Sequence, residues 1–82
     1  MLYYAIISYC LASCLSVEDM KRFIYEEPIG YFECIKVTSE MVVDVREHNP
    51  KTRSRPINTL CVAEDVLKGI EKYPVFRFGK PI

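Results

Sequence analysis

The sequence has a single histidine, three isolated glycines and no excess of either charge. Its 82 residues include 11 Lys and Arg against 11 Asp and Glu, which excludes a polycation of the histone-tail kind. Because Gly30, Gly69 and Gly79 stand apart, no glycine-rich loop that could cradle a phosphate group is present. Half of the residues are apolar, so the chain is not a disordered one, and its length allows one small domain over residues 1–82.

The lone histidine also limits the catalytic chemistry. Nucleophilic catalysis brings together a nucleophile, a base and a group that orients the base, and no pattern places a thiol beside His48. The adjacent carboxylates at 18–19, 26–27 and 64–65 fall in segments with helical spacing, where neighbours diverge by about 100° and do not converge on a substrate. We therefore expect no enzyme activity and no cofactor.

No charged side chain occurs before Glu18, so residues 1–17 form an uncharged, largely apolar segment. A secretory signal peptide needs a basic start, and no Lys or Arg precedes Lys21. Residues 11–14, LASC, resemble a lipoprotein cleavage motif, but without that basic start. A transmembrane helix needs about 20 apolar residues, more than the segment provides. We expect a buried strand, with a helix as the alternative, and no membrane insertion.

The four cysteines, at positions 10, 14, 34 and 61, lie within apolar stretches. Two disulfides would need a secretory context, which the N-terminal segment does not indicate. Structural zinc sites favour two closely spaced ligand pairs, whereas only Cys10 and Cys14 are close in this sequence. We therefore predict reduced, buried thiols, no bound metal and a cytoplasmic location.

The first half of the chain predicts a strand, a helix and a hairpin. Residues 2–10 are rich in aromatic and β-branched types, as in a buried strand. Ser16 and the acids after it are typical of a helix start, and apolar residues at helical spacing extend that helix to Pro28. Residues 29–38 and 40–48 predict two strands joined by a short turn.

The second half predicts a polar loop, a second helix and a last strand. Residues 49–57 are polar and contain two prolines. Apolar residues then recur at helical spacing, which predicts a helix from Asn58 or Thr59 to Tyr73. Residues 75–79 predict a short strand.

The resulting order, β-α-β-β-α-β, is that of the split βαβ, or ferredoxin-like, α+β fold. It predicts a four-stranded antiparallel sheet with two helices on one face and the other face open. The alternative is one long helix over residues 3–27 that accompanies a three-stranded sheet.

Charge is divided unevenly along the chain. Residues 18–47 have a net charge of −4, and residues 51–82 have a net charge of +4. The densest basic cluster lies in the predicted loop and alternates with hydroxyl residues, which suits contacts with phosphate or carboxylate groups. The candidate partner-binding residues are Arg46, Lys51, Arg53 and Arg55.

These features favour a small regulatory protein that binds a larger protein, in the manner of phage or viral modulators and inhibitors of host machinery. Six tyrosines support this, because Tyr offers a large contact area at a low entropic cost. One alternative is a nucleic-acid-binding domain that uses the basic loop at 51–55, and a second is a small enzyme or ligand sensor whose site has no sequence motif. The division of charge also favours head-to-tail self-association into a homo-oligomer.

Overall fold

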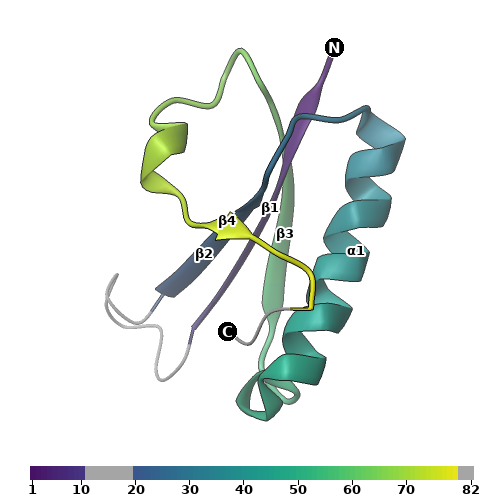
Figure 1. The fold of residues 1–82 in the computed structure, drawn as a ribbon, viewed down its shortest axis with the longest axis vertical. Helices are drawn as coiled ribbons and strands as arrows, with labels where there is room; N and C mark the ends of the chain where they lie inside the picture. The colour runs from purple at the N-terminus through teal and green to yellow at the C-terminus, as the bar shows by residue number, and fades with distance from the viewer. Residues whose placement is uncertain (11–19, 80–82) are drawn as a thin grey trace.

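One helix packs on one face of a four-stranded mixed sheet in the computed structural model, which describes residues 1–10 and 20–79 (Figure 1). The elements are β1 (Tyr3–Cys10), β2 (Met20–Tyr25), α1 (Tyr31–His48), η2 (Pro50–Thr52), β3 (Ile57–Ala63), η3 (Ile70–Lys72) and β4 (Val75–Phe76). The strand order is β3-β1-β2-β4, with β1 antiparallel to both neighbours and β2 parallel to β4. The predicted ferredoxin-like fold, with two helices and an all-antiparallel sheet, is therefore wrong.

The central strand β1 lies where residues 2–10 predicted a strand. Ala5, Ile7 and Tyr9 face α1, while Ile6 is buried on the opposite side of the sheet. A strand buried on both faces reads as a continuous apolar run, which is the pattern of this segment. The alternative of one long helix over residues 3–27 is wrong, because β1 and β2 occupy both of its ends. The LASC motif and the helix start at Ser16 lie outside the described residues.

The helix predicted to end at Pro28 is wrong over the residues that the structure describes, where the chain forms the strand β2. β2 pairs antiparallel with β1 from Met20 to Ile24. Phe23 packs against the core on the side of α1, whereas Ile24, next to it, is buried on the other face. Side chains of adjacent residues point to opposite faces of the sheet in a strand, as they do here. Pairing with β1 therefore outweighs the helical spacing of apolar residues in this segment.

The two strands predicted at 29–38 and 40–48 are wrong, because Tyr31–His48 form the helix α1. The buried positions recur at helical spacing, three or four residues apart. They are Cys34, Val37, Thr38, Met41 and Val45. The polar join that suggested a hairpin fits inside the helix, since the hydroxyls of Thr38 and Ser39 both donate to the carbonyl of Ile35, at 2.8 and 3.2 Å.

The helix predicted from Asn58 or Thr59 to Tyr73 is also wrong. Its first part is β3, which pairs with β1 along its full length. The rest forms turns and the short η3, on the side of the sheet away from α1 (Figure 1). Val66, which the helical pattern assigned to the core, is 65% exposed. The last predicted strand is present only as the two residues of β4, parallel to β2.

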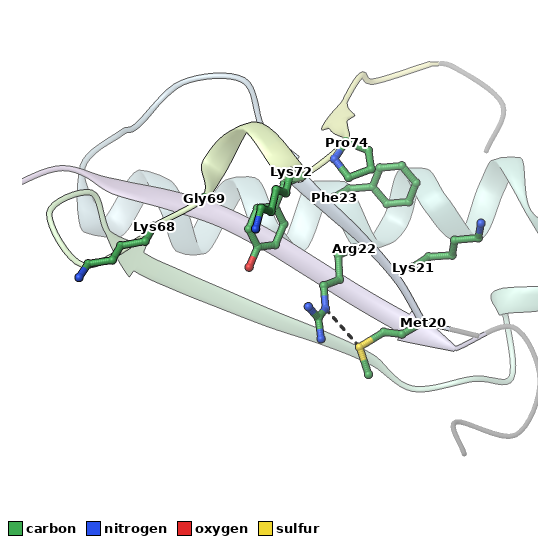
Figure 2. Close-up of a pocket in the computed structure, with 9 residues that line it drawn as sticks. Met20, Lys21, Arg22, Phe23, Lys68, Gly69, Lys72 and Pro74 are labelled. Atoms are coloured by element: carbon green, nitrogen blue, oxygen red, sulfur yellow. Dashed lines mark hydrogen bonds between the residues drawn. The ribbon is translucent and has the colours of Figure 1, made fainter. Parts of the chain in front are cut away.

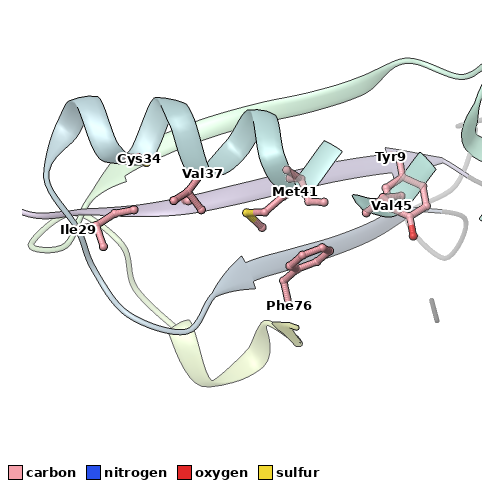
Figure 3. Packing of buried hydrophobic residues seen from close by; sticks show 9 residues of the cluster. Tyr9, Ile29, Cys34, Val37, Met41, Val45 and Phe76 are labelled. Atoms are coloured by element: carbon pink, nitrogen blue, oxygen red, sulfur yellow. The ribbon is translucent and has the colours of Figure 1, made fainter. Parts of the chain in front are cut away.

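The core fills the space between α1 and the sheet (Figure 3). Met41 and Val45 of α1 and Tyr9 of β1 are almost fully buried there. The ring of Phe23 lies 6.3 Å from that of Tyr9 and 6.1 Å from that of Phe76, so one aromatic cluster joins β1, β2 and β4. This cluster holds the short β4 against the sheet.

A disulfide between Cys34 and Cys61 connects α1 to β3, and Cys10 is disulfide-bonded as well. The prediction of reduced thiols is therefore wrong for these three residues. The predicted elements placed Cys34 on a strand and Cys61 on a helix, whereas in the structure α1 packs on β3 and the Cα atoms of the two cysteines are 6.1 Å apart. The prediction of a cytoplasmic location loses that support, since disulfides persist mainly in oxidising compartments. Among the described residues, no helix combines the length and apolarity needed to cross a bilayer.

The buried hydroxyl of Tyr9 has no hydrogen-bond partner within the described part of the chain, and burial raises the pKa of this group above 10.0. We expect Tyr9→Phe to raise the free energy of unfolding by about 1 kcal/mol, because the variant no longer buries an unsatisfied polar group. Above pH 10 the unfolded tyrosine ionises before the folded one does, so the wild type loses further stability there. Urea unfolding at neutral and alkaline pH checks both effects, and equal stability of the two proteins at both pH values would contradict them.

A candidate anion-binding groove beside β2

A groove of about 720 Å³ lies between the N-terminal part of β2 and the connection that contains η3 (Figure 2). Residues 20–23 of β2 form one wall. Residues 68–69 and 72–74 form the other. We call this space the basic groove.

The basic groove exists because β4 is too short to cover the whole edge of β2. β4 pairs only with Ile24 and Tyr25, and the backbone N–H of Ile24 donates to the carbonyl of Pro74 at 3.0 Å. Backbone groups of alternate residues in an antiparallel strand point to the same side, so the N–H and C=O of Arg22 also point away from β1. Among the described residues, no strand pairs with the outer side of β2 before Ile24.

The second wall is shaped by a left-handed glycine. Gly69 has a φ of 70°, a conformation that is costly for residues with a Cβ atom, and its carbonyl accepts the N–H of Lys72 at 2.9 Å. This turn starts η3 and directs the chain back toward β2. Lys68 and Lys72 therefore lie at either end of the turn, on the wall opposite Arg22 (Figure 2).

Among residues 1–10 and 20–79, no residue with a carboxylate lines the basic groove, whereas four lining residues carry a cationic side chain. They are Lys21, Arg22, Lys68 and Lys72. All four are exposed, and none forms an ion pair with any residue that the structure describes. The Nε of Arg22 donates to the sulfur of Met20 at 3.3 Å, which orients the guanidinium over the open sheet face. A concentration of uncompensated positive charge in a concave site attracts anions.

Negative charge gathers elsewhere, near the side of the sheet that α1 covers. The pKa of Tyr25 is raised by burial and, to a lesser degree, by the carboxylates of Glu27 and Glu26. Carboxylates on α1, at Glu33 and Glu40, act in the same direction. Arg22, from the acidic half of the sequence, thus lies with Lys68 and Lys72 of the basic half at the groove.

The predicted partner-binding residues lie at the C-terminal end of α1 and in the loop after it, away from the basic groove. Arg46 donates through Nη1 to the carbonyl of Arg53 at 2.8 Å and through Nη2 to that of Arg55 at 3.2 Å. Arg46 therefore anchors the loop to the helix. Lys51 and Arg53 are exposed and Arg55 is half-buried. A binding role for the loop stays a prediction.

The end of α1 also brings together Asp44, Glu47 and His48, whose possible ligand atoms lie within 4.8 Å of one another. The carboxylate of Asp44 already accepts the backbone N–H of Gly79 at 3.2 Å, and Nδ1 of His48 lies 3.5 Å from it. These contacts tie the segment after β4 to α1. We therefore interpret the cluster as a structural connection rather than a cation site.

The basic groove was not predicted from the sequence, because its charges come from two segments that are far apart along the chain. Lys21 and Arg22 were assigned to a helix in the acidic half of the chain, and Lys68 and Lys72 to the end of another helix. The spacing of the two lysines was the one available signal, and it is equally common at the C-terminus of a helix. No family model matches the sequence, and comparisons with curated proteins and with solved structures find no significant match.

Proposed function

We propose that this protein is a small, non-catalytic regulatory protein that binds an acidic, extended segment of a larger protein in the basic groove. The proposal rests on two features of the part of the chain that the structure describes: four cations that form no ion pair there, and a stretch of β2 whose outer side pairs with no strand there. The cations supply attraction for carboxylates, and the edge supplies backbone donors and acceptors.

The strand edge favours a peptide over a nucleic acid. The N–H and C=O of Arg22 face the groove, and an extended peptide can pair with them in line with β4. A nucleic acid has no matching backbone. The acidic side of the molecule, around Glu27 and Glu40, would also repel a long phosphate chain, whereas a short acidic segment contacts only the basic side.

Reversal of two groove charges should abolish most of this binding. We expect Lys68→Glu/Lys72→Glu to bind a fluorescent peptide of alternating Glu and Val at least tenfold more weakly than the wild type, a loss of about 1.4 kcal/mol. Both side chains are exposed, so the free energy of unfolding should change little. Fluorescence anisotropy at low and moderate salt provides the measurement, and wild-type affinity should fall as salt screens the charges.

The matched control is Lys51→Glu/Arg53→Glu, which makes the same change in net charge at the exposed loop. This variant should keep the wild-type affinity for the acidic peptide. Loss of affinity in the loop variant alone, or an equal loss in both variants, would refute the groove as the binding site. A single-stranded oligonucleotide serves as the second probe: if it binds through the groove and the peptide does not, the protein-partner proposal is wrong.

A further inference from the structure

The other edge of the sheet is formed by β3, and no strand of the described residues pairs with its outer side. β3 is the outermost strand, and its inner side pairs with β1. The N–H of Glu64 donates to the carbonyl of Leu2 at 3.0 Å, so the backbone groups of Glu64 point inward, toward β1. By the alternation of an antiparallel pair, Val62, Leu60 and Asn58 also direct their backbone groups toward β1. The residues that direct theirs outward are Ile57, Thr59, Cys61 and Ala63.

This outer edge lacks the features that normally prevent strands from pairing between molecules. β3, INTLCVA, has no charged residue and no proline along its length. Leu60 is 56% exposed on the open face, and Ile35 of α1, 45% exposed, lies beside the same strand on the other face. Each face along the edge therefore presents an exposed apolar side chain, beside the exposed polar side chains of Asn58 and Thr59, and such side chains suit contact with another protein surface.

We propose that a second copy of this chain pairs with the edge, with the two β3 strands antiparallel about a twofold axis at Leu60. In this register Ile57 lies opposite Ala63, and Thr59 lies opposite Cys61. Every residue with outward backbone groups then has a partner of the same kind, as an antiparallel ladder requires. A shift of the register by one residue would place outward groups opposite inward ones.

Charge complementarity selects a second copy as the occupant. The segment before β3 carries Lys51, Arg53 and Arg55, and the turn after it carries Glu64 and Asp65. Antiparallel pairing about Leu60 brings the basic segment of one copy beside the acidic turn of the other, at both ends of the interface. Such a self-complementary arrangement is what a twofold dimer needs.

The dimer would have one continuous sheet with both copies of α1 on the same face. The two basic grooves would lie at its far edges, so a partner with two acidic segments could bind both at once. The dimer does not depend on the proposed function, because the basic groove lies beside β2 and β3 lies on the far side of β1 from it.

A cysteine at the twofold axis gives a direct test. Leu60 of the two copies would form a non-hydrogen-bonded pair with Cα atoms about 4.5 Å apart, within the range that a disulfide spans. Under a glutathione redox buffer, Leu60→Cys should yield a covalent dimer, seen as a doubled mass on a non-reducing gel. The matched control is Val62→Cys, on the same face of β3, because the two copies of residue 62 would be roughly 13 Å apart along the strands. Equal cross-linking of both variants would overturn the register.

Charge reversal tests the same interface without a new thiol. Sedimentation equilibrium should show the wild type as a dimer of two 9.6-kDa chains at micromolar concentrations. Glu64→Lys/Asp65→Lys should weaken dimerisation at least tenfold, and adding Lys51→Glu/Arg53→Glu/Arg55→Glu to it should restore most of the loss. A wild-type mass that remains monomeric up to high micromolar concentrations would overturn the proposal, as would reversal variants that dimerise like the wild type.

Discussion

Val45→Asp is expected to unfold the protein, whereas Val66→Asp is expected to leave it folded. Val45 lies on the face of α1 toward the sheet and is fully buried, and no described residue of the core around it carries a positive charge. An unpaired charge buried there costs several kcal/mol, comparable to the whole stability of about 5 to 10 kcal/mol expected for a domain of this size. Val66 is 65% exposed in the turn after β3, so a carboxylate at that position remains in water.

Far-UV circular dichroism and urea unfolding distinguish the two variants. We expect Val45→Asp to lose the helical signal without denaturant, and Val66→Asp to unfold within about 0.5 kcal/mol of the wild type. The pair is informative because the helix predicted at 58–73 would bury Val66, while the strand predicted at 40–48 also buries Val45. A folded Val45→Asp variant, or an unfolded Val66→Asp variant, would contradict the described packing.

The strand β1 could be predicted from sequence because its residue pattern indicates a buried strand and little else. Residues 3–10 are apolar and aromatic with little helical spacing, and burial on both faces needs such a run. The last strand was predicted in place but was too long, since the chain turns at Phe78 and Gly79, where the Asp44 carboxylate accepts the N–H of Gly79. That contact joins residues far apart in the sequence, and local pattern cannot reveal it.

The helix α1 was missed although its spacing is present in the sequence. Cys34, Val37, Met41 and Val45 mark its buried face, but the valines and the Thr-Ser pair between them favour strands and a turn by local propensity. Packing against the sheet outweighs this propensity, and the hydroxyl bonds to Ile35 satisfy the polar residues.

At β3 the sequence predicted a helix, but the structure has a strand. Leu60, Ala63 and Leu67 are spaced as on a helix, but Leu60 and Leu67 line the open side of the sheet from two different elements, the strand and the chain after it. Pairing with β1 decides the structure of this segment, and β1 is some fifty residues away in the sequence. The basic groove, which depends on the placement of β2 and the η3 connection, could not be predicted for the same reason.

Removal of the Cys34–Cys61 disulfide is expected to lower the free energy of unfolding by about 3 kcal/mol. The two cysteines are 27 residues apart, so the bond restricts a sizeable loop in the unfolded chain. For a domain of this length, the loss corresponds to a fall in melting temperature of roughly 15 °C. We propose Cys34→Ala/Cys61→Ala for the test, because serine at the fully buried position 34 would introduce a polar group into the core.

Thermal and urea unfolding of the double variant should show a folded but less stable protein. Reductant should destabilise the wild type by at least as much as the double substitution does, because it also reduces the disulfide of Cys10. The remaining stability of the variant then measures what apolar packing between α1 and the sheet provides alone. An unchanged unfolding midpoint in the variant would mean that this packing holds α1 against β3 without the covalent connection, and that oxidation is not needed for the fold.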